Sequence, residues 1–149
     1  MYDIKKLKQL REETEISFSL CKKALEESKN NITTAKKLLN KWGIAKAKDK
    51  SGRNTGTGII FSYVHHNKKV ASLVQLACET DFVSGNNDFQ SLGQELAMQV
   101  ASIRAETNEE FLNQEYIRDP SKKVSDLIKE AVLKFGENIK LVKFVRWSV

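Results

Sequence analysis

Residues 58–79, GIIFSYVHHNKKVASLVQLACE, decide how this chain folds. On both sides of the polar HHNKK the apolar residues recur with a period of two, which predicts strands at 58–64 and 70–79. Residues 65–69 are typical of a turn, so the segment is expected to form an antiparallel hairpin. Alternation places Val74, Leu76 and Cys78 on one face of the second strand, and we expect that face to meet the core.

Two amphipathic helices and a third strand follow the hairpin. Asn87 and Gln90 predict a capping-box start for the first helix, whose apolar stripe is Phe89, Leu92, Leu96, Val100 and Ile103. The second helix spans 124–135 and is closed by Gly136, and residues 139–147 predict the third strand. The acidic stretch 105–121, which contains the only proline, is expected to be a long connection. Residues 58–149 therefore predict an α+β core domain, a small three-stranded antiparallel sheet covered by helices.

The first 43 residues predict three short helices. Apolar positions recur at helical spacing, Ser17 and Asn31 are suitable N-caps, and Gly43 occupies a position typical of a C-cap. Such short helices are unstable alone but can bury their apolar stripes against one another, so residues 1–43 are expected to form one module. Residues 44–57, rich in Lys and Gly, are expected to form a basic linker that is helical at first and flexible after Ser51.

Composition restricts the class of protein. Of 149 residues, 40% are hydrophobic and 30% charged, which is typical of a folded globular chain. Its net charge of +6 is concentrated in residues 1–56, with 14 Lys/Arg and 7 Asp/Glu. No apolar run approaches the roughly 20 residues that span a bilayer, no secretory signal is present, and the two cysteines are too few for a disulfide scaffold. We expect a cytoplasmic protein that does not engage a membrane.

The sequence contains no motif for a cofactor, a bound metal or a catalytic triad. His65 and His66 fall in the predicted turn, where nothing local would orient them for catalysis or metal binding. Cys21 precedes two lysines, which could lower its pKa, but its place on the helical stripe favours packing. A protein that is not an enzyme is therefore expected.

The segment Thr80-Asp81-Phe82-Val83 allows two interpretations. Strict alternation would place Phe82 on the core face and leave Asp81 as a solvated strand end. In the second interpretation the strand ends first, and a projecting tip presents a carboxylate beside an aromatic ring. Such a ring can enter an apolar pocket of a partner, where aromatic anchors often dominate the binding energy.

Three motifs in order resemble the elongation factor Ts family, in a compact form. Leu10-Arg11-Glu12-Glu13-Thr14 with Cys21-Lys22-Lys23-Ala24-Leu25 resembles its N-terminal module. The tetrapeptide 80–83 resembles its core motif, and Gly136-Glu137-Asn138-Ile139 before a basic strand is the third match. The resemblance implies a guanine-nucleotide exchange factor that binds elongation factor Tu with GDP. It also implies that residues 1–43 are a ubiquitin-associated-like bundle.

The resemblance assigns contact roles to three groups of residues. Thr80, Asp81, Phe82 and Val83 would approach the switch and phosphate-binding region of elongation factor Tu, where Asp81 would help to displace Mg²⁺. In the N-terminal module the partner-binding residues would be Arg11, Ser19 and Lys22, and in the core they would be Phe135 and Gly136. No cofactor and no direct nucleic-acid contact are implied.

Two questions stay open at this point. The chain is short, so full coverage of the partner requires a homodimer, as in other short members of the family, or else coverage is partial. The alternative function is a ubiquitin-associated-like adaptor that binds another protein or RNA through the basic N-terminal third. That alternative predicts that charge reversal at Lys46, Lys48 and Lys50 abolishes binding, whereas Phe82→Ala does not.

Overall fold

The three N-terminal helices form where the apolar spacing predicts them. A computed structural model describes all of residues 1–149, with α1 at Ile4–Thr14, α2 at Phe18–Glu27 and α3 at Ile32–Lys50. The side chains of Asp3, Ser17 and Asn31 cap the three helices, because each accepts a hydrogen bond from a backbone N–H of the first turn. Their stripes meet in one buried cluster that contains Leu7, Leu10, Cys21, Ala24, Leu25, Ala35 and Leu39.

Gly43 is not the C-cap that its sequence position suggested. It is buried in the interior of α3, which continues to Lys50 through the helix-favouring stretch 44–50. A Cβ at Gly43 would lie 3.3 Å from the carbonyl oxygen of Lys129 and 3.5 Å from Cβ of Leu133, both in α7 (Val124–Phe135). The glycine therefore lets two helices approach closely. The expected linker begins as helix, and only residues 51–56 connect it to the sheet.

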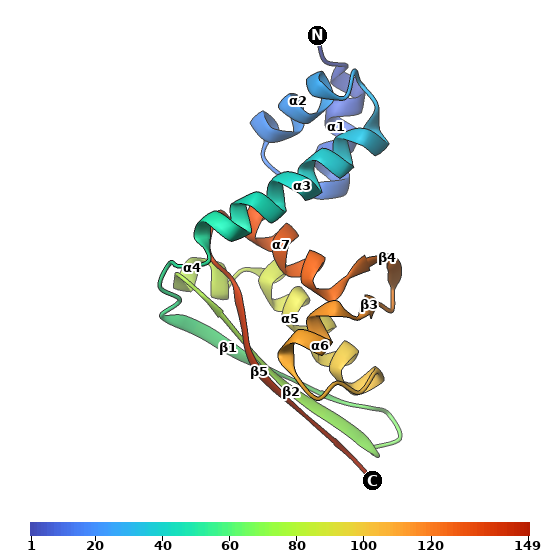
Figure 1. The fold of residues 1–149 in the computed structure, drawn as a ribbon, viewed down its shortest axis with the longest axis vertical. Coiled ribbons are helices and arrows are strands. Elements are labelled where there is room, and N and C mark those ends of the chain that lie inside the picture. Colours follow the sequence, from blue (N-terminus) through green and yellow to red (C-terminus); the bar gives the residue numbers. More distant parts are fainter.

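The predicted sheet is confirmed. Strands β1 (Thr57–Val64), β2 (Val70–Cys78) and β5 (Lys140–Ser148) pair antiparallel in the order β1-β2-β5. Residues 65–69 form the turn between the first two strands, and Phe61 pairs with Val74, which in turn pairs with Phe144. The molecule thus belongs to the predicted α+β class (Figure 1).

Helix α5 (Asn87–Ser102) lies against the sheet, and α7 lies against α3 and α5 (Figure 1). Phe89, Leu96 and Val100 are buried as predicted, but Ile103 is 40% exposed because the helix ends before it. The N-cap is Asn86 rather than Asn87, since the side chain of Asn86 accepts a hydrogen bond from Asp88 N at 2.8 Å.

Residues 105–121 are more structured than the long connection that was expected. They contain α6 (Asn108–Asn113), β3 (Glu115–Tyr116) and the start of β4 (Asp119–Lys123), which pairs with β3 and includes Pro120. The buried amide of Gln99 holds this segment in place. Its Nε2 donates to the carbonyl oxygen of Glu115 at 3.1 Å, and its Oε1 accepts from Ile117 N at 3.1 Å.

The sheet face that points away from α5 exposes several large apolar side chains beside the polar Ser62, Gln75 and Lys143. Register places Ile60, Val64, Leu73 and Trp147 on this outer face, with exposed fractions of 65%, 61%, 39% and 67%. Monomeric proteins rarely leave large contiguous apolar patches in water. None of the helices is both long enough and apolar enough to cross a membrane.

Candidate functional site

The segment 80–83 projects from the end of β2. The strand ends at Cys78, and Asp81–Ser84 form the single helical turn α4. Thr80 caps this turn, because its Oγ1 accepts a hydrogen bond from Val83 N at 3.4 Å. The turn breaks the alternation, so the structure has the second of the two arrangements. Phe82 is 91% exposed, whereas Val83 is buried and anchors the turn to the core. We call residues 80–83 the tip.

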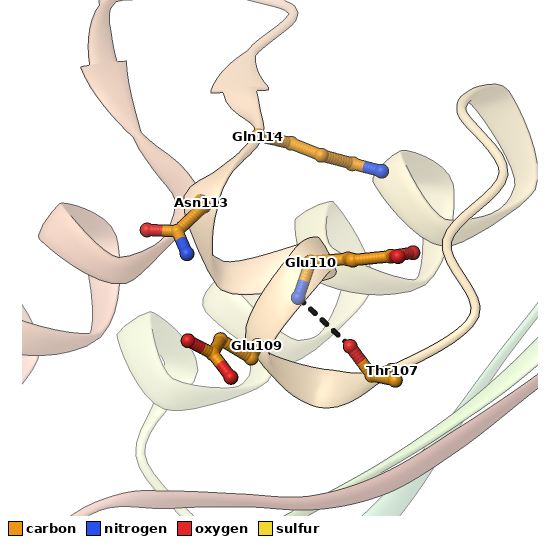
Figure 2. Close-up of a pocket in the computed structure, with 5 residues that line it drawn as sticks. All are labelled: Thr107, Glu109, Glu110, Asn113 and Gln114. Atoms are coloured by element: carbon orange, nitrogen blue, oxygen red, sulfur yellow. Dashed lines mark hydrogen bonds between the residues drawn. The ribbon is translucent and has the colours of Figure 1, made fainter.

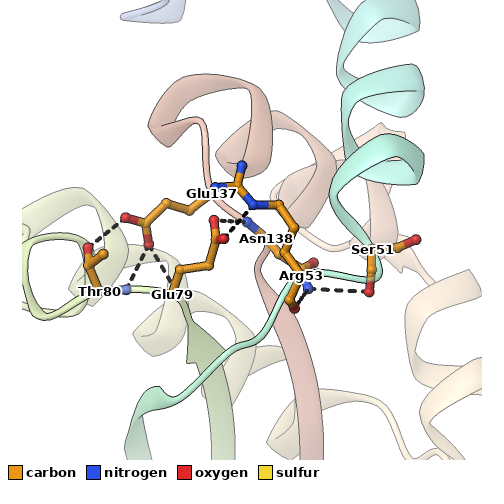
Figure 3. A network of polar contacts seen from close by, with 6 residues as sticks. All are labelled: Ser51, Arg53, Glu79, Thr80, Glu137 and Asn138. Carbon is orange, nitrogen blue, oxygen red and sulfur yellow. Dashed lines mark hydrogen bonds and ion pairs between the residues drawn. The ribbon is translucent and has the colours of Figure 1, made fainter.

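The tip is fixed at its base by the carboxylate of Glu137. One oxygen of that carboxylate accepts hydrogen bonds from the backbone N–H groups of Glu79 and Thr80, each at 3.0 Å. The other oxygen accepts from Thr80 Oγ1 at 2.6 Å (Figure 3). A strand end normally leaves such N–H groups to water, and a charged acceptor makes stronger hydrogen bonds than a neutral one. Glu137 therefore holds the tip in one orientation.

A second set of contacts surrounds this carboxylate. The Glu79 side chain accepts from Asn138 N at 2.9 Å and pairs with Arg53 Nε at 2.7 Å. Asn138, which is buried, donates through Nδ2 to the carbonyl oxygen of Arg53 at 2.9 Å. The segment between α3 and β1, the end of β2 and the segment between α7 and β5 thus meet below the tip (Figure 3).

Asp81 and Phe82 point out of this framework. Asp81 is exposed, and its Oδ1 accepts a hydrogen bond from Thr57 Oγ1 at 3.4 Å. No Lys, Arg or His lies within ion-pair distance of its carboxylate, so its negative charge is not neutralised by a neighbouring cation. The tip combines an uncompensated carboxylate with an exposed aromatic ring on a rigid base.

Phe135 and Gly136 lie next to the base of the tip. Phe135 ends α7 and packs partly against the core, while Gly136 caps that helix with a left-handed backbone, φ 70°. That backbone turn directly precedes Glu137, so the third motif and the tip meet in space.

Arg11, Ser19 and Lys22 lie elsewhere, on α1 and α2 near the far end of α3 (Figure 1). Arg11 and Ser19 are exposed, and Lys22 is partly exposed with its Nζ 4.9 Å from the ring centroid of Tyr2. The structure therefore presents two separate candidate surfaces, one on the N-terminal helices and one at the tip.

The remaining candidate residues are the histidines of the hairpin and the two cysteines. Tyr63 OH and His65 Nδ1 are 2.9 Å apart in the hairpin, and no group of three His, Cys, Asp or Glu could hold a metal ion. Burial raises the pKa of both the Cys21 and the Cys78 thiols, which favours the unreactive protonated form.

A hollow on α6 is lined only by polar residues, Thr107, Glu109, Glu110, Asn113 and Gln114 (Figure 2). The one hydrogen bond drawn there, from Glu110 N to Thr107 Oγ1 at 3.1 Å, is the N-cap of that helix. The Gln114 side chain also donates to the carbonyl oxygens of Ile103 and Arg104, each at 3.4 Å, so the Thr107 and Gln114 side chains have structural hydrogen bonds within this segment.

Sequence reasoning missed the positioning residues of the tip. In the sequence, Glu137 and Asn138 belong only to the third motif, and Arg53 is only one of the basic residues of the predicted linker 44–57. The hydrogen bonds of Glu137 and Asn138 in this framework join residues that are 57 to 87 positions apart, and no local pattern signals such pairs.

The sequence of this chain is similar to those of known proteins of one family. The family model for elongation factor Ts matches residues 79–149, a range that contains the tip and Glu137. An elongation factor Ts of Thermosipho melanesiensis is 38% identical and covers 100% of this chain and 99% of its own length. One from Coprothermobacter proteolyticus is 35% identical, with 96% and 95% coverage. One from Aquifex aeolicus is 40% identical over 99% of this chain, which spans 52% of that relative.

Proposed function

Because this chain belongs to the elongation factor Ts family and is thus a translation elongation factor, we propose that it binds elongation factor Tu with GDP and accelerates GDP release. The observation that carries the proposal is the 91% exposure of Phe82 on a tip whose base is held by Glu137. An aromatic side chain held in water by a rigid framework is suited to enter a pocket on another protein.

The mechanism follows from the pair of side chains at the tip. Phe82 enters between structural elements of the partner and displaces them, while the Asp81 carboxylate approaches the region of the Mg²⁺ ion that the partner holds with GDP. Mg²⁺ tolerates little departure from octahedral geometry, so a small displacement of its ligands weakens its binding. Without the cation, the negative charge of the diphosphate is less compensated and GDP leaves faster.

Exchange of this kind needs no chemical active site. The factor weakens GDP binding, and by linkage GDP weakens binding of the factor to the same extent, typically by about 1–3 kcal/mol or roughly 5–150-fold. No bond forms or breaks, so the contributing groups are contact residues.

We further propose that the chain works as two units. Residues 1–43, a ubiquitin-associated-like module, would bind the partner through Arg11, Ser19 and Lys22, and core residues 58–149 would bind it through the tip, Phe135 and Gly136. The adaptor alternative for the basic N-terminal third is not favoured, because relatives that match the whole chain are elongation factors Ts.

Homodimer formation is proposed on separate grounds. A second copy placed on the outer sheet face would remove Ile60, Val64, Leu73 and Trp147 from water through a self-complementary two-fold contact. Sedimentation equilibrium should give a dimer for the wild type and a monomer for Trp147→Lys. A monomeric wild type at micromolar concentration would contradict this proposal.

The test of function is the release of labelled GDP from elongation factor Tu with wild type and with Phe82→Ala. Truncation of an aromatic anchor typically costs about 2 kcal/mol or more, so stimulated release should fall at least about tenfold. The free energy of unfolding should change little, because the ring is exposed. Ile117→Ala is the control, since Ile117 is 48% exposed on the distant β3–β4 turn. Equal stimulation by wild type and Phe82→Ala would refute the mechanism.

A further inference from the structure

Helix α3 belongs to both parts of the molecule. Its first half packs in the N-terminal cluster, and its second half lies along α7 of the core (Figure 1). Gly43 permits the close approach of the two helices. Leu133 of α7 is a buried member of the N-terminal hydrophobic cluster rather than of the core cluster. Packing therefore joins the N-terminal module to the core.

Lys134 adds a polar connection at the same junction. Its Nζ lies 2.7 Å from Asp88 Oδ2 on α5 and forms a second ion pair with Glu15, the residue that caps α1. The Lys134 side chain is only 20% exposed. Burial alone would lower its pKa, but hydrogen bonds to Asp88 and Glu15 raise the pKa above its ordinary value. One ammonium group thus bridges the N-terminal module and the core.

We propose that Lys134 is a positioning residue that fixes the orientation of the N-terminal module relative to the tip, so that both surfaces contact one partner molecule at the same time. This inference rests on the proposed function, which places contact residues on both surfaces. When two surfaces are held in the correct geometry, binding of the first makes binding of the second effectively intramolecular. A module that samples many orientations loses that advantage.

Orientation, rather than stability, is the property that this bridge controls. Glu15 and Asp88 have side chains that are 58% and 48% exposed, and ion pairs with exposed carboxylates contribute little to folding. Burial of Leu133 and the close α3–α7 contact supply the adhesion between the parts. The hydrophobic effect is non-directional, whereas the bridge links specific atoms at the end of α1, on α5 and on α7.

The first test measures orientation without any partner. Spin labels are attached at Glu12→Cys on α1 and Glu109→Cys on α6, both exposed, while the two native cysteines are buried. Electron–electron distance measurements should give a narrow distribution in the wild-type background. The distribution should become about twice as wide with Lys134→Met, which keeps the aliphatic stem but removes the charge.

Three further variants separate the bridge from nonspecific effects. Lys134→Arg keeps both ion pairs and should restore the narrow distribution. Glu15→Gln breaks the bridge from the module side, away from Phe135, and should reproduce the effect of Lys134→Met. Lys122→Met is the matched control, because its ion pair with Glu130, at 2.8 Å, joins two residues of the core domain and does not involve the N-terminal module. A distribution equally narrow in Lys134→Met and Lys122→Met would overturn the proposal.

The second test is GDP release as a function of factor concentration. Lys134→Met should raise the half-saturating concentration about threefold to tenfold and leave the maximal rate within about twofold, since the tip is intact. Unchanged half-saturation beside a broadened distribution would overturn the link to simultaneous contact. If the wild type failed to stimulate release at all, the proposed function would fail, whereas the distance measurement would still decide whether the bridge fixes the module.

Discussion

Substitution of Glu137 by alanine should loosen the tip and destabilise the fold. The change removes an acceptor of three hydrogen bonds, from the N–H groups of Glu79 and Thr80 and from Thr80 Oγ1. A hydrogen bond to a charged group contributes about 1.5–3 kcal/mol. Because the site is only half-buried, water can solvate part of the N–H and O–H donors that lose their acceptor. We expect the free energy of unfolding to fall by about 3 kcal/mol.

Glu137→Gln is the matched variant. Its amide oxygen can still accept from both N–H groups, but the charge is lost and an NH2 group replaces the oxygen that accepted from Thr80 Oγ1. We therefore expect a smaller decrease than for Glu137→Ala, about 1–2 kcal/mol. Urea unfolding followed by tryptophan fluorescence gives both free energies. Amide hydrogen exchange at Glu79 and Thr80 gives the local effect directly. If both amides stayed as protected in Glu137→Ala as in the wild type, the role assigned to the carboxylate would be wrong.

Two predictions concern the core and alkaline pH. A Cβ at Gly93 would lie 2.1 Å from the Phe61 ring, so Gly93→Ala should lower the free energy of unfolding by about 1–3 kcal/mol, whereas Gly52→Ala, with nothing within 4 Å, should change it little. Equal urea midpoints for the two variants would contradict the close packing. Burial and the hydrogen bond to Glu95 raise the pKa of Tyr116 to about 12, above its ordinary value of about 10. The folded state thus retains the phenolic proton, and this contribution to stability is complete below about pH 10 and disappears as the pH rises through about 12. Urea midpoints between pH 9 and 11.5 should fall more for wild type than for Tyr116→Phe, and parallel curves would contradict the assignment.

Local patterns predicted most of the secondary structure because their causes are local. The hairpin of β1 and β2 follows from alternation around a polar turn, and Gly136 ends α7 with the left-handed backbone that glycine favours. Cys21 and Cys78 are buried, as their places in the stripes indicated. Asn86, not Asn87, is the cap, although only Asn87 has a Gln three residues later. Both asparagines are suitable N-caps, and the Gln90 side chain donates to the carbonyl oxygen of Ser84 at 2.8 Å instead of closing a capping box.

Errors arose where a distant contact decides the conformation. Gly43 resembles a residue that ends a helix. A glycine is favoured there because the carbonyl oxygen of Lys129, far along the chain, leaves little room for a side chain. The sequence of residues 105–121 gives little sign of its short strands, because hydrogen bonds to the side-chain amide of Gln99 support them rather than an apolar stripe. The division into units at 43 and 57, and the roles of the contact residues, stay predictions.

Alternation alone would have buried Phe82. Its exposure depends on Thr80, which ends the strand and begins a helical turn, and on the carboxylate that holds Thr80 there. The family motif pointed to the right tetrapeptide without revealing this cause.

The Glu137 carboxylate that holds Thr80 also has a consequence for biosynthesis. This carboxylate belongs to Glu137, which is synthesised 57 positions after Thr80. On the ribosome, all residues of the β1–β2 hairpin are synthesised well before that acceptor. A truncated product that stops between residues 84 and 136 contains the whole tip but lacks the Glu137 carboxylate, so the tip is held in place only in chains that have been translated through residue 137.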